Sequence, residues 1–199
     1  MARVESPRGQ RNRARIAQTA ARLIAEHGLT DWSAAKRKAC RELGFPDNEP
    51  LPSNEEIEQA LRDYNSLFRA DAQAVSLRQQ RQTAMAWMER LAAWRPVLIG
   101  GVAAGWATAH SAVHLELEAE DPKAVELGLI NAGIDYEPSG TGQKLPTQLV
   151  AGRGDSAVRL QIVSPLQRRN RPRRDEDARL THNELRVLLD ADSAGATPS

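Results

Sequence analysis

The stretch from Asn54 to Arg95 spans 42 residues and contains neither glycine nor proline. These two residues interrupt helices more than any others, so a run of this length without them favours helical structure. Ser53 and Glu56 form a capping-box pattern at its start, and Pro96 ends it. Apolar residues recur along the run at helical spacing. The sequence therefore predicts one long helix, or two helices that meet in the polar stretch 76–82.

Two shorter helices are expected before this run. Residues 12–27 place apolar side chains at helical spacing, and Gly28 follows as a natural stop. Residues 34–43 form the second helix, which Asp31 or Ser33 can cap at its N-terminus. The first third of the chain is thus predicted to be helical.

The chain after the long run mixes strand and helix signals. Its Gly-Arg-Gly-Asp-Ser segment predicts a hairpin turn between two strands. The charged run 168–179 is expected to be an exposed connector. The elements expected here, in chain order, are strands over 97–99 and 113–119, a helix over 123–132, strands over 134–137, 145–151 and 157–164, and a helix over 183–190 capped by Thr181.

These signals define the expected architecture. Residues 1–10 and 191–199 are expected to be disordered, because they are polar and contain helix breakers. Residues 11–95 form a helical region, and residues 96–190 form a small α/β domain with a mixed sheet. The predicted fold class is therefore α+β.

Composition narrows the classes of function only a little. The formal net charge is +1, so overall charge does not argue for nucleic acid or for a membrane surface. Cys40 is the sole cysteine, which excludes an internal disulfide. The N-terminus lacks the apolar core of a signal peptide, and no apolar run is long enough to span a membrane. We expect a cytoplasmic protein with no membrane partner.

The most informative motif is a glycine pair between two predicted strands. Ile99 is followed by Gly100 and Gly101, ten residues follow, and an alternating strand begins near Ala112. This pattern resembles the nucleotidyltransferase superfamily over roughly residues 96–165. In that family a strand ends in Gly-Gly or Gly-Ser, and a second strand carries two acidic residues that hold catalytic magnesium.

The resemblance implies a minimal nucleotidyltransferase-like domain whose catalytic acids are lost. The two acidic positions fall on Ala112, which cannot bind a metal, and on His114, a poor magnesium ligand. A later strand, where the family carries a third acid, offers only Arg159 and Gln161. The positions that the resemblance implies for nucleotide binding are Gly100, Gly101, Gly105 and Ser111.

A displaced metal site is the alternative. His114, Glu116 and Glu118 lie on one face of the predicted strand, because strand side chains alternate between faces. The two glutamates repeat the acid–apolar–acid spacing, four residues later than the family places it. An active enzyme of this kind would require Mg²⁺ or Mn²⁺ and a nucleoside triphosphate.

The N-terminal helices suggest a further alternative. Residues 16–44 resemble the opening of TetR-type regulators, and arginines cluster at positions 8, 11, 13 and 15 and at 168, 169, 171, 173 and 174. The third helix, however, begins with acidic residues, which would repel phosphate.

Three hypotheses follow. The first is a degenerate nucleotidyltransferase-like module that binds a nucleotide or a partner without standard magnesium-dependent transfer. The second is an active nucleotidyltransferase with the displaced site. The third is a nucleic-acid-binding regulator that uses the N-terminal helices. The long amphipathic helix also favours self-association or a protein partner.

Overall fold

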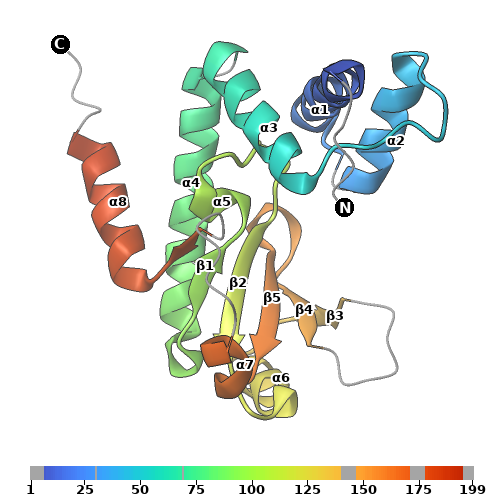
Figure 1. Cartoon of the computed structure of the whole chain (residues 1–199). Helices are drawn as coiled ribbons and strands as arrows, with labels where there is room; N and C mark the ends of the chain where they lie inside the picture. Colours follow the sequence, from blue (N-terminus) through green and yellow to red (C-terminus); the bar gives the residue numbers. More distant parts are fainter. Residues whose placement is uncertain (1–6, 30, 69, 140–146, 171–177, 195–199) are drawn as a thin grey trace. The chain divides into compact units, whose positions relative to one another are not determined.

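The computed structural model describes residues 7–29, 31–68, 70–139, 147–170 and 178–194 (Figure 1). Helices dominate the first part of the chain, and a mixed six-stranded sheet is assembled from the described residues of the second part. The α+β class with a helical N-terminal region is therefore confirmed. No helix within the described ranges is both long enough and apolar enough to cross a membrane.

The chain divides into two compact units. One comprises residues 1–76 and 105–111, and the other comprises residues 77–104 and 112–199. This division differs from the expected boundary at residue 95. The reason lies in α4 (Ala70–Arg90), whose C-terminal half buries Ala84, Trp87 and Met88 in the unit that contains the sheet.

The first unit is built on α1 (Pro7–His27), α2 (Trp32–Glu42) and α3 (Asn54–Phe68). Helix α1 begins at Pro7, so the expected disorder is wrong for residues 7–10. Proline is favourable in a first helical turn, because its missing N–H has no helical partner there. The apolar side chains of the three helices form one core, which includes Ile16, Ala20, Leu23, Ile24, Ala35, Ala39, Ile57 and Leu61.

The long run between Asn54 and Arg95 contains two described helices, α3 and α4, with Arg69 outside the described residues. The polar stretch 76–82, expected to allow a break, lies inside α4 and is helical. Its residues are good helix formers, and Leu77 and Arg81 on it are buried. The predicted position of the break is therefore wrong.

The sheet of the second unit has the strand order β3-β4-β5-β2-β1-β6. Strands β2 and β5 pair in parallel, and every other neighbouring pair is antiparallel. The strands are β1 (Val97–Ile99), β2 (Val113–Glu118), β3 (Tyr136–Pro138), β4 (Gln148–Ala151), β5 (Val158–Val163) and β6 (Arg179–Leu180).

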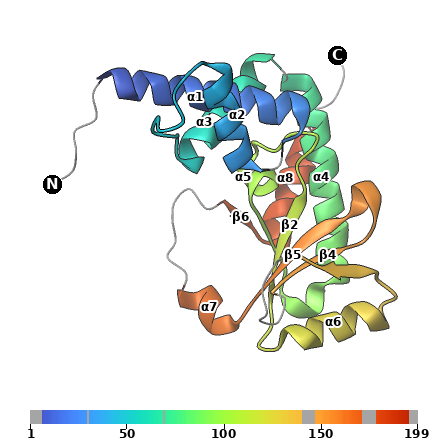
Figure 2. The same cartoon turned by 90° about the vertical axis from the view of Figure 1, so that its right-hand side faces the viewer.

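Helices cover the two faces of this sheet differently (Figure 2). Helix α4 and helix α6 (Pro122–Asn131) lie on one face, and helix α7 (Pro165–Asn170) lies on the other. Leu115 and Leu160, from neighbouring central strands, are buried on the face that meets α4 and α6. The polar residues that alternate with them face α7.

Two expectations for the end of the chain are wrong. Helix α7 covers residues 168–170, which were expected to begin the exposed connector 168–179, and residues 171–177 of that run lie outside the described residues. Helix α8 (His182–Ala194) continues through residues 191–194, which were expected to be disordered. Leu185 anchors α8, because its side chain is fully buried. The expected start of β4, at residues 145–146, also lies outside the described residues.

Candidate functional site

Strand β2 carries the three polar side chains that the displaced-site hypothesis selects. His114, Glu116 and Glu118 alternate with buried apolar residues and therefore share one face of the sheet. Glu116 lies opposite Val97 on β1 and Gln161 on β5. The three side chains thus lie in a row on one face, as the alternation in the sequence predicts. Strand β2 is a central strand of the sheet, between β5 and β1.

The carboxylate of Glu116 is completely buried and is bound by two guanidinium groups. Arg168 of α7 donates from Nε to Oε1 at 2.9 Å. Arg179 of β6 donates from Nη1 to Oε2 at 3.1 Å and from Nη2 to Oε1. Burial alone would raise the pKa of Glu116, but the hydrogen bonds and charges of the two arginines outweigh it and lower the pKa below its usual value. Glu116 is therefore an ionised, fully paired carboxylate.

The neighbouring Glu118 belongs to the same cluster. Its Oε2 accepts from Nη1 of Arg168 at 3.2 Å, and its Oε1 accepts from Nη1 of Arg95 at 3.2 Å. Arg168 also donates to the backbone carbonyl oxygens of Arg95 and Glu116. We call Arg95, Glu116, Glu118, Arg168 and Arg179 the arginine–glutamate cluster.

This geometry does not support the displaced metal site. Guanidinium groups occupy the oxygens of both glutamates, and their positive charges would repel a divalent cation. Across the described part of the chain, no group of three or more His, Cys, Asp or Glu side chains is placed to bind a metal ion. The chemistry of the cluster is that of a structural charge network.

Among the described residues, no hydrogen bond or ion pair is seen between His114 and that network, although His114 and Arg179 both pair with Ile99. The pKa of the half-buried His114 imidazole is lowered, because burial disfavours the charged form and the positive charge of Arg159 adds to the effect. Arg159 lies directly opposite His114 on β5. His114 is therefore neutral near pH 7.

The predicted glycine loop has the backbone that only glycine adopts easily. Gly100 follows β1 with a φ of 73°, and Gly101 begins the short helix α5 (Gly101–Ala104). A Cβ at Gly100 would meet nothing within 4 Å, so the space beside this residue is open. The glycine is required by the turn, and the turn leaves room for a ligand.

The other two predicted nucleotide-binding residues belong to the other unit, where they make structural contacts. The carbonyl oxygen of Gly105 accepts from Nε2 of Gln73 at 2.9 Å. Oγ of Ser111 accepts from the backbone N–H of Thr108 at 3.0 Å. Both residues thus shape the segment 105–111.

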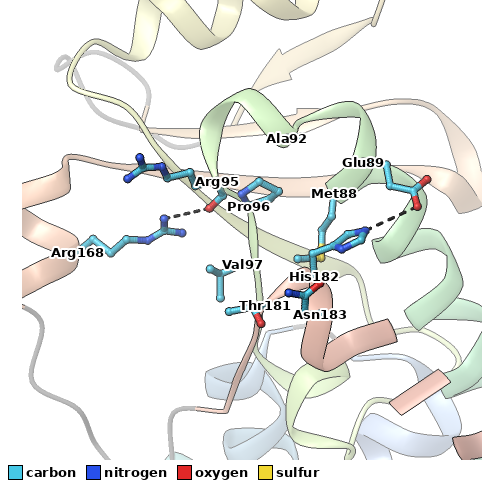
Figure 3. A pocket seen from close by; sticks show the side chains of 10 residues that line it. All are labelled: Met88, Glu89, Ala92, Arg95, Pro96, Val97, Arg168, Thr181, His182 and Asn183. Atoms are coloured by element: carbon cyan, nitrogen blue, oxygen red, sulfur yellow. Dashed lines mark hydrogen bonds and ion pairs between the residues drawn. The ribbon is translucent and has the colours of Figure 1, made fainter. Parts of the chain in front are cut away.

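A pocket of about 610 Å³ adjoins the arginine–glutamate cluster (Figure 3). Met88, Pro96 and Val97 contribute apolar surface, while Arg95 and Arg168 lie on one side and the pair Glu89–His182 on the other. Nε2 of His182 is 3.7 Å from Oε1 of Glu89. The remaining lining residues are Ala92, Thr181 and Asn183.

Sequence reasoning did not identify the arginines of the cluster. Arg168 and Arg179 belong to a charged run, and such runs are usually solvated. Their partner Glu116 lies 52 and 63 residues earlier in the chain. The available signal was the apolar residue on either side of Glu116, which indicated a buried strand whose charge needed a partner.

The N-terminal arginines are also partly engaged. Nε of Arg13 lies 3.0 Å from Oε1 of Glu56, Arg22 pairs with Glu42, and the Arg15 guanidinium lies over the Phe45 ring. These contacts stay within the helical unit, so they add no support to a nucleic-acid interface.

Comparison of the chain with protein-family models, with curated proteins and with solved structures gives no match in any of the three.

Proposed function

We propose that this protein is a degenerate nucleotidyltransferase-like binding module that does not carry out magnesium-dependent transfer. The observation that carries the proposal is the Glu116 carboxylate, which is buried and neutralised by Arg168 and Arg179. A carboxylate held in this way stabilises the fold and has no oxygen left for a catalytic cation.

The glycine loop supports the binding half of the proposal. Gly100 adopts a left-handed backbone beside open space, and the strand–glycine–strand order expected from the resemblance is present in β1, α5 and β2. Strand β5, the later strand of the resemblance, pairs in parallel with β2 on the side away from β1. A phosphate group can approach such a turn closely, because no Cβ blocks it.

The test is a calorimetric titration of ATP and the other nucleoside triphosphates with Mg²⁺, with Mn²⁺ and with EDTA. We expect binding of similar affinity in all three conditions and no release of pyrophosphate. Binding that requires the metal, or pyrophosphate release, would instead support the active transferase.

A matched pair of variants assigns the binding to the loop. Gly100→Ala introduces a Cβ at a φ of 73°, and Gly133→Ala does so at a φ of 64°, both next to open space. We expect triphosphate affinity to fall by about tenfold or more in Gly100→Ala only. Equal affinity in both variants would remove the loop from the proposal.

A second candidate function is self-association through the long helical run. Leu67, Phe68 and Val75 in this run are 73%, 70% and 70% exposed. Large apolar side chains exposed to this degree are typical of contact surfaces when they gather. Sedimentation velocity over a hundredfold concentration range tests this candidate. Leu67→Lys should abolish any dimer, whereas a dimer that persists in this variant would contradict it.

A further inference from the structure

The pocket beside the arginine–glutamate cluster has the features of a ligand site. Its volume of about 610 Å³ lies within the range of roughly 300–1,000 Å³ that small-molecule sites occupy. Ala92 is exposed and Pro96 and Val97 are half-buried, so these lining residues offer an apolar surface beside the almost fully buried Met88. Charged groups lie only at its two sides (Figure 3). Apolar walls with a few convergent polar groups are typical of sites that bind small organic molecules.

The charges of the cluster do not balance. Among the described residues, three guanidinium groups meet two carboxylates, which leaves one positive charge in excess. Within the described part of the chain, Glu116 pairs with Arg168 and Arg179, whereas the carboxylate paired with Arg95 is Glu118, which Arg168 also contacts. The Arg95 side chain is 80% exposed. Arg95 is therefore the most exposed guanidinium of the cluster, and it lines the pocket.

The backbone of Arg95 is unusual. Its φ of 46° and ψ of 58° place it in the left-handed region, and it is the one non-glycine residue with positive φ among the described residues. The N–H of Arg95 donates to the carbonyl of Ala92 at 3.1 Å, and its carbonyl accepts from Nη1 of Arg168 at 3.0 Å. A conformation that is disfavoured for a side chain with a Cβ persists when its surroundings hold it, and such residues gather at ligand sites.

We propose that this pocket binds a small organic anion, whose apolar body lies against Ala92, Pro96 and Val97 and whose carboxylate or phosphate group pairs with Arg95. The opposite wall sets the orientation, because the Glu89 carboxylate would repel the anionic end of the ligand. The inference goes beyond the proposed function, since Gly100 and Gly101 do not line this pocket.

The experiment uses two fluorescent probes on the full chain. 8-Anilinonaphthalene-1-sulfonate has an aromatic body and one anionic group, and N-phenyl-1-naphthylamine has a similar body without the charge. Arg95→Asn removes the guanidinium, and asparagine tolerates the left-handed backbone better than most residues. We expect this variant to raise the dissociation constant of the anionic probe by about tenfold, because one charge-assisted contact is lost. The dissociation constant of the neutral probe should stay unchanged.

Arg153→Asn is the matched control. Arg153 is 83% exposed in the same unit, pairs with Asp135 and lies outside the pocket, so its removal should leave both dissociation constants unchanged. Arg95→Lys keeps the charge and should restore most of the affinity for the anionic probe. Ala92→Phe adds a ring at the pocket wall and should weaken the binding of both probes.

Displacement of the anionic probe identifies the charged group of the ligand. We expect hexanoate or hexyl phosphate to displace it at concentrations at which hexanol does not, and the stronger of the two anions indicates the preferred group. The proposal is overturned if Arg95→Asn binds the anionic probe as the natural chain does, if Arg153→Asn loses affinity equally, or if hexanol displaces the probe as well as the anions do. Failure here leaves the triphosphate titration of Gly100→Ala unaffected, because that variant tests a different loop.

Discussion

Arg179 reaches across strand β1 to bind both carboxylate oxygens of Glu116. The register explains how a residue two strands away makes this contact. Arg179 pairs with Ile99, and Glu116 pairs with Val97, two residues along β1 on the same face. The guanidinium thus lies diagonally over β1 and ties the edge strand β6 to the centre of the sheet.

We predict that Glu116→Gln destabilises the protein by about 3–5 kcal/mol, because it removes the buried carboxylate that two guanidinium groups require. Glu118→Gln should lose less than half as much, since Arg95, one of its two partners, is largely exposed. Urea denaturation monitored by circular dichroism gives both values. Equal losses would show that burial does not distinguish the two glutamates.

We predict that Gly128→Ala destabilises the protein by about 1–3 kcal/mol, although alanine favours helices and Gly128 lies inside α6. A Cβ at this position would lie 2.2 Å from Cη2 of Trp94. Thermal unfolding of Gly128→Ala, Trp94→Leu and the double variant tests this explanation. If the clash is the cause, the double variant is more stable than the sum of the single losses predicts; additive losses would exclude it.

We predict that Arg81→Met loosens helix α8. Arg81 is buried, and it donates to the carbonyl oxygen of Val102 and to Oδ2 of Asp192 on α8, each at 3.4 Å. Without Arg81, the carbonyl of Val102 loses a donor and Asp192 loses its ion-pair partner, which together should cost about 1–3 kcal/mol. Amide hydrogen exchange should become faster in α8 than in β2. Unchanged protection of α8 would show that Arg81 does not anchor the helix.

We predict that acid destabilises the protein in two steps. The lowered pKa of His114 means that the unfolded chain binds a proton below about pH 6.5 while the folded chain does not, so stability falls as the pH falls from 7.5 to 5.5. The lowered pKa of Glu116 adds a second loss below about pH 4.5.

Melting temperature against pH separates these steps. His114→Gln should flatten the curve between pH 7.5 and 5.5 and leave the lower step in place. A curve of His114→Gln that keeps its full slope in the upper range would assign that step to other groups.

Much of the local structure was predicted correctly because its determinants are close in sequence. The pattern of Thr181 and Glu184 predicted the start of α8, and the reciprocal hydrogen bonds of the capping box are present. Asp31 caps α2 by accepting from the backbone N–H groups of Ser33 and Ala34. The alternation in β2 likewise placed His114, Glu116 and Glu118 on one face.

The site itself was predicted less well. The row of polar residues on β2 was identified, but the guanidinium groups that pair with it were assigned to an exposed connector. The pocket was not anticipated, since its lining comes from the end of α4, the start of β1, α7 and the first turn of α8. No spacing rule connects Met88, Val97 and His182, and the left-handed backbone of Arg95 is not typical of arginine.

Helix ends, strand periodicity and the α+β class thus follow from interactions between residues a few positions apart, where backbone geometry alone sets the distances. Whether Glu116 and Glu118 bind a metal ion or pair with arginines depended on segments up to 63 residues away in the chain. Glu116 has the same chemistry in a metal site and in an ion pair. Only the position of α7 over the sheet and the pairing of β6 with β1 decided that arginines would meet it. The reason is that a buried charge must be compensated, and the tertiary structure determines which partner is within reach.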